Sequence, residues 1–122
     1  MKTKIAVIED ETAIADMYCF KLEHEGFEVK KALDGLQGLE LCESFLPDLI
    51  LLDLRMPHMS GDEMLKKLRE TEWGSHMRVV ILTNISRDEA PASLRFLNVD
   101  RYIVKAHVTP AQVVRTVEEV LR

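Results

Sequence analysis

Four runs of consecutive apolar residues each lead into side chains with acid, base or hydrogen-bonding chemistry. The run at 49–52 has no polar residue at alternate positions, which is typical of a strand buried on both faces of a parallel sheet, and it leads directly into Asp53. The other three runs, at 5–8, 79–82 and 102–104, lead into Glu9 and Asp10, Thr83, and Lys105. The carboxyl ends of parallel strands meet at the sheet edge where α/β proteins bind ligands, so we expect these five side chains to lie together.

Helical patterns alternate with the strands along the whole chain. Strands are predicted at 4–9, 27–31, 49–52, 78–83 and 102–105, and helices at 12–25, 35–46, 61–72, 86–97 and 109–121. Strands that alternate with single helices form right-handed βαβ units, so the sequence predicts an α/β fold with a doubly wound, five-stranded parallel sheet in one domain, residues 1–122. Two weak points are expected: Gly38 inside the second helix, and Pro91 in the early turns of the fourth.

The composition is that of a globular protein with an adequate core. A chain of 122 residues can bury such a core without disulfides. Its net charge of −5 argues weakly against nucleic-acid binding. Cys19 and Cys42 lack the spacing of metal ligands, and two reduced thiols favour a cytoplasmic location. No signal peptide is visible, and no apolar run approaches the roughly 18 residues that a membrane span needs.

The predicted grouping of Glu9, Asp10 and Asp53 needs a counter-charge, because three neighbouring carboxylates repel one another. An all-oxygen set of carboxylates and waters suits Mg²⁺, which keeps part of its hydration shell. Lys105 adds a second positive group, and Thr83 adds a hydrogen-bond donor. A divalent cation, a lysine and a hydroxyl around one carboxylate are the parts that hold a transferring phosphoryl group, with Asp53 as the nucleophile.

Four segments carry a family resemblance when they are taken in order. They are Glu9–Glu11, Asp53–Gly61, Ile81–Thr83 and Tyr102–Lys105. Together they resemble response-regulator receiver domains. The first segment resembles the acidic pocket of that family, and the second resembles its phosphoacceptor loop. The third resembles the strand that ends in the switch hydroxyl, and the fourth resembles the strand that carries the switch aromatic residue and the lysine. The resemblance covers the whole chain, and the four motifs together are highly specific. It implies the flavodoxin-like fold of chemotaxis regulators, with strand order 2-1-3-4-5.

The resemblance implies a role for each residue of the predicted site. Asp53 would accept a phosphoryl group from the phosphohistidine of a sensor histidine kinase or a phosphotransfer protein, or from a small acyl phosphate. Asp10 would bind Mg²⁺ directly, Glu9 would bind it mainly through water, and the backbone carbonyl of Arg55 would be a further ligand. Lys105 would pair with the phosphoryl oxygens.

The resemblance also implies a conformational switch. Thr83 would move to hydrogen-bond the phosphoryl group, and Tyr102 would swing inward behind it. The change would reach the face formed by 86–97, 102–105 and 109–121, and it would act on an output protein that the sequence does not identify. No direct contact with nucleic acid or membrane is expected. Nor is any enzyme activity expected beyond self-phosphorylation and slow self-dephosphorylation.

Four residues distinguish this chain from many receivers. Ala106 stands where proline often follows the lysine, and the sequence leaves the isomer of that peptide bond open. Asn84 stands where a smaller residue is common, so its side chain can narrow the route to Asp53. Arg55 and Ile85 occupy the positions that flank the phosphoryl site, and we expect them to tune the lifetime of the phosphorylated state.

Two other functions compete with a stand-alone signalling switch. The chain can be the receiver module of a longer DNA-binding regulator or of a hybrid kinase, although a last helix that ends near Arg122 without a linker favours the stand-alone form. A small phosphatase with an aspartate nucleophile is disfavoured. Hydrolases of the haloacid-dehalogenase type have a second aspartate two residues after the first, where this chain has Arg55.

A homodimer through the 86–97, 102–105 and 109–121 face is a further possibility. Its charges would come from Arg95, Asp100, Arg101, Arg115 and Glu118. Arg101 precedes Tyr102, whereas receivers of transcription factors usually have an acidic residue there, and this weakens the case for that type of dimer.

Overall fold

A parallel sheet of five strands forms the centre of the computed structural model, which describes all 122 residues. The strands are β1 (Lys4–Ile8), β2 (Glu28–Ala32), β3 (Leu49–Leu52), β4 (Arg78–Thr83) and β5 (Arg101–Val104). All neighbouring strands pair in parallel, and their order across the sheet is β2-β1-β3-β4-β5. The predicted sheet and its strand order are therefore confirmed.

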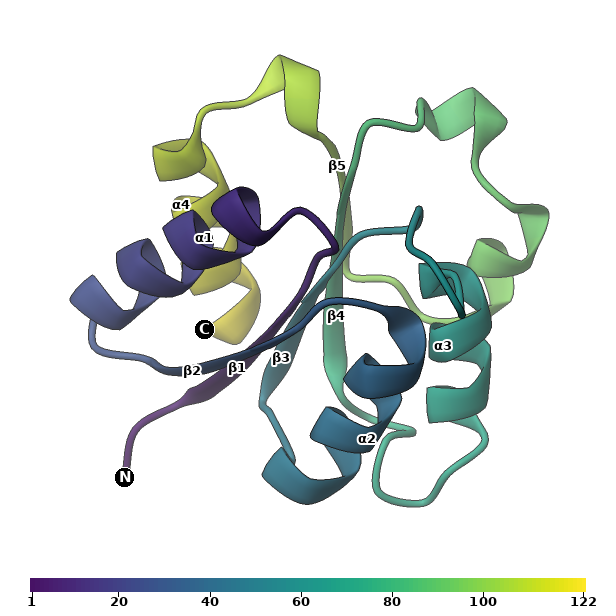
Figure 1. Cartoon of the computed structure of the whole chain (residues 1–122), viewed down its shortest axis with the longest axis horizontal. Coiled ribbons are helices and arrows are strands. Elements are labelled where there is room, and N and C mark those ends of the chain that lie inside the picture. The colour runs from purple at the N-terminus through teal and green to yellow at the C-terminus, as the bar shows by residue number, and fades with distance from the viewer.

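Four α-helices cover the two faces of the sheet (Figure 1). They are α1 (Thr12–His24), α2 (Gly35–Phe45), α3 (Gly61–Arg69) and α4 (Pro110–Leu121). The helices α1 and α4 pack on one face, and α2 and α3 pack on the other. The strands β1, β3 and β4 are buried almost throughout because they lie between the two layers, which explains their unbroken apolar runs. None of the helices combines the length and apolarity needed to cross a membrane.

The prediction of an α-helix over 86–97 is wrong. The segment contains two 3₁₀ helices, Arg87–Glu89 and Ala92–Phe96, with Pro91 between them. Proline lacks an amide hydrogen and disfavours helical backbone at the preceding residue, and Ala90 accordingly has an extended ψ of 147°. The face considered for a homodimer therefore has two short turns where a regular helix was expected.

The glycine inside α2 has a packing role. A Cβ atom on Gly38 would lie 2.8 Å from Cγ2 of Ile8 and 3.0 Å from the sulfur of Met64. The missing side chain lets α2 approach β1 and α3 closely, and this offsets the helix-propensity cost of about 1 kcal/mol. Because Ile8 directly precedes Glu9, the same contact supports the end of β1 that carries the acidic residues.

Candidate functional site

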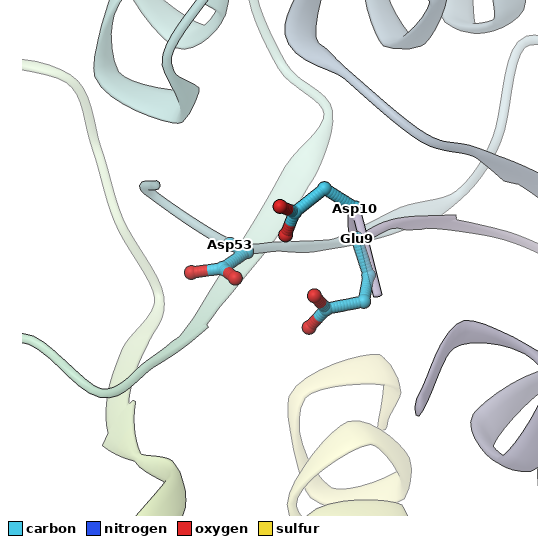
Figure 2. A group of neighbouring side chains, drawn as sticks. All are labelled: Glu9, Asp10 and Asp53. Carbon is cyan, nitrogen blue, oxygen red and sulfur yellow. The ribbon is translucent and has the colours of Figure 1, made fainter. Parts of the chain in front are cut away.

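The carboxyl edge of the sheet brings together three carboxylates from two strand ends. Glu9 and Asp10 follow β1, and Asp53 follows β3 (Figure 2). One oxygen from each of the three groups lies within 4.8 Å of the others. Glu9 and Asp53 are buried and Asp10 is exposed, so the cluster opens to solvent on the side of Asp10. The backbone fixes the two buried members, because the Asp53 N–H donates to the Ile8 carbonyl over 3.0 Å and the Glu11 N–H donates to Glu9 Oε2 over 3.1 Å.

Lys105 supplies the counter-charge from the end of β5. Its Nζ lies 2.5 Å from Glu9 Oε1 and 3.1 Å from Asp53 Oδ2. Burial alone would lower the pKa of Lys105, but the hydrogen bond that Lys105 donates to Glu9 and the charges of Asp53 and Glu9 outweigh it and raise that pKa. Burial raises the pKa of Glu9, and the hydrogen bond from Lys105 only partly offsets this. The peptide bond between Lys105 and Ala106, left open by the sequence, is trans.

The backbone after β3 orients Asp53. The Leu54 N–H donates to Asp53 Oδ1 over 2.7 Å, and the Arg55 N–H approaches the same oxygen at 3.4 Å. Gly61, the first residue of α3, donates its N–H to the Leu54 carbonyl over 2.9 Å. A Cβ atom on Gly61 would overlap the Asp53 carbonyl oxygen, so glycine is needed for this close approach of α3 to β3.

A cavity of about 280 Å³ opens over Asp53. Its lining consists of Asp10, Glu11, Asp53, Arg55, Thr83, Asn84, Ile85 and Lys105. The sequence predicted that three residues flank the phosphoryl site or narrow the route to Asp53. All three border this cavity: Arg55, Asn84 and Ile85. Glu11, which belongs to the segment that resembles an acidic pocket but received no role of its own, also lines the cavity.

Thr83 and Tyr102 meet at the loop after β4. The Tyr102 hydroxyl donates to the Ile85 carbonyl over 2.7 Å, and the Ile85 N–H approaches Thr83 Oγ1 at 3.4 Å. The guanidinium of Arg87 lies 5.6 Å from the centre of the Tyr102 ring and donates to the Tyr102 carbonyl over 3.4 Å. Burial raises the pKa of Tyr102, with the Arg87 charge opposing it, so the phenol keeps the proton of its hydrogen bond at neutral pH.

Three residues with contacts around the site were not predicted. Arg87 contacts Tyr102 across 15 residues of sequence, and no local pattern signals such a pair. Asp34 and His58 pair at 2.9 Å, and His58 lies in the loop that follows Asp53, with its imidazole largely exposed. The only available signal was Asp34 before the start of a helix, which predicts a cap but not a partner 24 residues away.

The chain belongs to the family of response regulator receiver domains, whose sequence profile matches residues 5–118. The phosphate regulon transcriptional regulatory protein PhoB of Rhizobium meliloti is 37% identical over 117 residues, which make up 94% of this chain and 51% of that protein. PhoB of Escherichia coli is 34% identical over 122 residues, 100% of this chain and 53% of that protein. The chain thus spans about half the length of the curated relatives that it matches.

Solved structures agree with this assignment. A CheY-like response regulator receiver domain protein from Methanospirillum hungatei superposes with a TM-score of 0.88 at 31% identity, covering 99% of this chain and 94% of that one. The chemotaxis protein CheY4 of Vibrio cholerae gives a TM-score of 0.90 at 26% identity, covering 99% and 100%. These comparisons confirm the predicted family and the flavodoxin-like fold. Receiver domains are signalling modules rather than classical enzymes, which supports the signalling prediction over the phosphatase.

Proposed function

We propose that this receiver domain is a phosphorylation-dependent switch in which Asp53 accepts a phosphoryl group from a histidine kinase or a phosphotransfer protein. The observation that carries the proposal is the position of Asp53, buried at the base of the cavity with Lys105 Nζ at 3.1 Å and two further carboxylates alongside. A carboxylate oxygen attacks phosphorus, and a P–O bond forms as the P–N bond of the phosphohistidine breaks. The donor imidazole leaves with that electron pair and takes up a proton.

The donor atoms around Asp53 fit Mg²⁺. Three carboxylates with oxygens within 4.8 Å of one another form an all-oxygen set, and hard cations of this kind prefer such ligands. Glu9, Asp10 and Asp53 would hold the ion, with the backbone carbonyl of Arg55 as a further ligand. Bound Mg²⁺ supplies positive charge that offsets the repulsion between the carboxylates and the incoming phosphoryl group.

Lys105 and Thr83 would bind the phosphoryl group on Asp53 and so change their contacts when the domain is phosphorylated. Lys105 is 14% exposed and already contacts Asp53, so its ammonium is placed to bind a phosphoryl oxygen without first losing a large hydration shell. Thr83 lines the same cavity and can turn its hydroxyl toward the phosphoryl group. Its present contact with the Ile85 N–H would then change, and with it the position of the loop that the Tyr102 hydroxyl holds.

The output is proposed to be protein binding, with the chain acting alone or as one module of a longer regulator. The second form is favoured by the relatives: they are transcriptional regulatory proteins about twice the length of the matched region. Of the charges suggested for a homodimer, Asp100 is partly engaged inside its own chain, where its Oδ2 accepts the Val79 N–H over 2.8 Å.

Intact-mass measurement after incubation with acetyl phosphate and Mg²⁺ tests the proposal. The wild-type chain is expected to gain one phosphoryl group, and Asp53→Asn should gain none, while Asp88→Asn, an exposed aspartate in the 3₁₀ helix Arg87–Glu89, should gain it normally. Labelling of Asp53→Asn to the wild-type extent would contradict the proposal. Steady release of phosphate from a generic phosphomonoester would instead support the phosphatase alternative.

A further inference from the structure

The first turn of α2 holds the loop between β3 and α3, residues 54–60, from one side. The Gly35 N–H donates to the Met59 carbonyl over 3.0 Å. A Cβ atom on Gly35 would overlap that carbonyl group, so only glycine permits this approach. One residue earlier, Asp34 Oδ2 lies 2.9 Å from Nδ1 of His58. Two successive residues at the start of α2 therefore contact two successive residues of the loop.

The Asp34 carboxylate uses both of its oxygens. Oδ1 caps α2 by accepting the Gln37 N–H over 2.8 Å, and Oδ2 is left for His58. The Gln37 N–H and His58 lower the pKa of Asp34, so this group is a carboxylate at neutral pH. A carboxylate only accepts hydrogen bonds, so Nδ1 of His58 carries the proton between them. The bond is charge-assisted, and its acceptor is sheltered, since the Asp34 side chain is only 7% exposed.

His58 adopts a backbone conformation that residues with a side chain rarely take. Its φ is 67°, in the left-handed region. The loop keeps this conformation while Gly61 fixes one end of it and Gly35 fixes the neighbouring Met59. The imidazole is 70% exposed, so it is held by the Asp34 bond and not by burial. That bond is therefore the side-chain contact that secures the turn at His58.

The same junction supports the acidic side of the site. Ala32, the last residue of β2, accepts the Glu9 N–H over 3.0 Å, and Asp34 follows only two residues later. On the other side, His58 lies three residues after Arg55, whose carbonyl is proposed to face Mg²⁺. The bond between Asp34 and His58 thus joins the strand that holds Glu9 to the loop that presents Arg55.

We infer that Asp34 and His58 are positioning residues for the Mg²⁺ site: neither touches the metal, but their bond sets the distance between its acidic side and its carbonyl side. The inference rests on the proposed function. It assigns to the carboxylate of Asp34 a role beyond the cap of α2, because the capping oxygen and the oxygen that binds His58 are different atoms.

Calorimetric titration of the full chain with Mg²⁺ alone tests the inference. His58→Ala keeps the cap of α2 and removes the bond to Asp34. It is expected to weaken Mg²⁺ binding about threefold to tenfold, the size of effect that loss of one hydrogen bond of ordinary net strength produces. The backbone amide resonances of Arg55 and Met59 should shift in the same variant without metal, because the loop loses its side-chain bond to Asp34.

Two further substitutions separate the bond from the backbone conformation. His58→Asn should restore most of the affinity, since an amide N–H can donate to Asp34 and asparagine tolerates left-handed backbone. His58→Gly removes the strain without supplying a donor, so it should bind Mg²⁺ as weakly as His58→Ala. His76→Ala, an exposed histidine in the loop between α3 and β4, is the matched control and should bind Mg²⁺ like the wild type.

The outcomes distinguish this inference from the function on which it rests. Wild-type Mg²⁺ affinity in His58→Ala, whatever its unfolding temperature, or full affinity in His58→Gly, would overturn the positioning role and leave the phosphorylation proposal intact. A wild-type chain that neither binds Mg²⁺ nor accepts a phosphoryl group would overturn both. If His58→Ala does not fold, the comparison of His58→Asn with His58→Gly decides the question.

Discussion

The two sides of the cavity over Asp53 are held very differently. One side, which we term the fixed wall, is the loop 54–60; Gly61 holds one end, and Gly35 and Asp34 hold its middle. The other side, the switch wall, is the segment 84–97. It consists of two short 3₁₀ helices around Pro91, and only Leu94 and Leu97 of its residues are buried. Burial does not separate the two walls, because Leu54 is the only buried residue of the loop 54–60. They differ in their hydrogen bonds: the loop is tied at its middle and its end to α2 and α3, whereas the switch wall is attached near its ends.

The switch wall is attached near both of its ends. Close to the site, the Tyr102 hydroxyl holds the Ile85 carbonyl. At the far end, Arg69 of α3 donates from Nε to the Leu97 carbonyl over 2.8 Å and from Nη2 to the Asn98 carbonyl over 3.0 Å. The same guanidinium reaches the loop before β4, where Nη1 donates to the Met77 carbonyl over 2.7 Å. A phosphoryl group at Asp53 would therefore lie between a loop that is tied along its length and a segment that is attached only near its ends.

The largest effect is expected from breaking the fixed wall. Gly61→Ala puts a Cβ atom into the Asp53 carbonyl and should lower the free energy of unfolding by about 3 kcal/mol, because neither backbone can move away cheaply. Gly26→Ala, where φ is 98° but no atom lies within 4 Å of the new Cβ, should cost only about 1 kcal/mol. Urea titration followed by the fluorescence of Trp73, the single tryptophan, measures both. Equal losses of unfolding free energy in the two variants would mean that a Cβ atom at position 61 does not clash with the Asp53 carbonyl.

The next effect comes from releasing the far end of the switch wall. Arg69→Met leaves carbonyls of two loops without their donor and should lower the free energy of unfolding by about 2 kcal/mol. Arg69→Lys should recover little, since an ammonium lacks the planar fork of donors. Arg95→Gln, an exposed arginine in the switch wall, should change stability by less than about 0.5 kcal/mol. An Arg69→Met variant as stable as Arg95→Gln would show that the hydrogen bonds of Arg69 contribute nothing to the free energy of unfolding.

Substitutions on each side of the cavity should alter the lifetime of the phosphorylated state. Arg55 lies on the fixed wall and Ile85 on the switch wall, and both line the cavity. Truncating either to alanine changes the access of water to the phosphoryl group, and we expect about threefold to tenfold changes in the dephosphorylation rate. Loss of phosphoryl label after removal of the donor measures the rate. If Arg55→Ala and Ile85→Ala both keep the wild-type rate, neither residue tunes the lifetime.

The smallest effect is expected where the switch wall meets β5. Arg87→Ala removes the cation over the Tyr102 ring and its bond to the Tyr102 carbonyl. Under the proposal that Tyr102 moves when Asp53 is phosphorylated, these contacts hold Tyr102 in its present position. We therefore expect their loss to tighten the binding of beryllofluoride with Mg²⁺ about twofold to fivefold, the value of an exposed cation–π contact. Arg87→Lys should lie between this variant and the wild type. Weaker binding by Arg87→Ala would show that the contact favours the phosphorylated arrangement instead.

The sheet and the gathering of the chemical side chains followed from local patterns. A run such as 49–52 with no polar residue is typical of a strand buried on both faces, and parallel strands share one carboxyl edge. Asp53, Glu9 and Lys105 were therefore expected together, and the structure places them within hydrogen-bonding distance. Their roles in phosphorylation stay predictions until the labelling experiment is done.

The segment 86–97 shows where local patterns do not decide. Leu94 and Leu97 are three residues apart, and a 3₁₀ helix with three residues per turn buries such a pair as readily as an α-helix does. Pro91 indicated distortion at the start of the predicted helix, yet only its packing and the extended backbone at Ala90 show that the helix is replaced along its length.

The sequence by itself determined the sheet, the family and the set of side chains at its carboxyl edge, because burial periodicity and strand ends are properties of short stretches of chain. Only the tertiary structure decided where each wall of the cavity is attached. The bond from Asp34 to His58, the bonds from Arg69 to the Leu97 and Asn98 carbonyls, and the cation over Tyr102 join residues far apart in the chain. Such contacts depend on how elements approach one another in space, and no periodicity in the sequence records that distance.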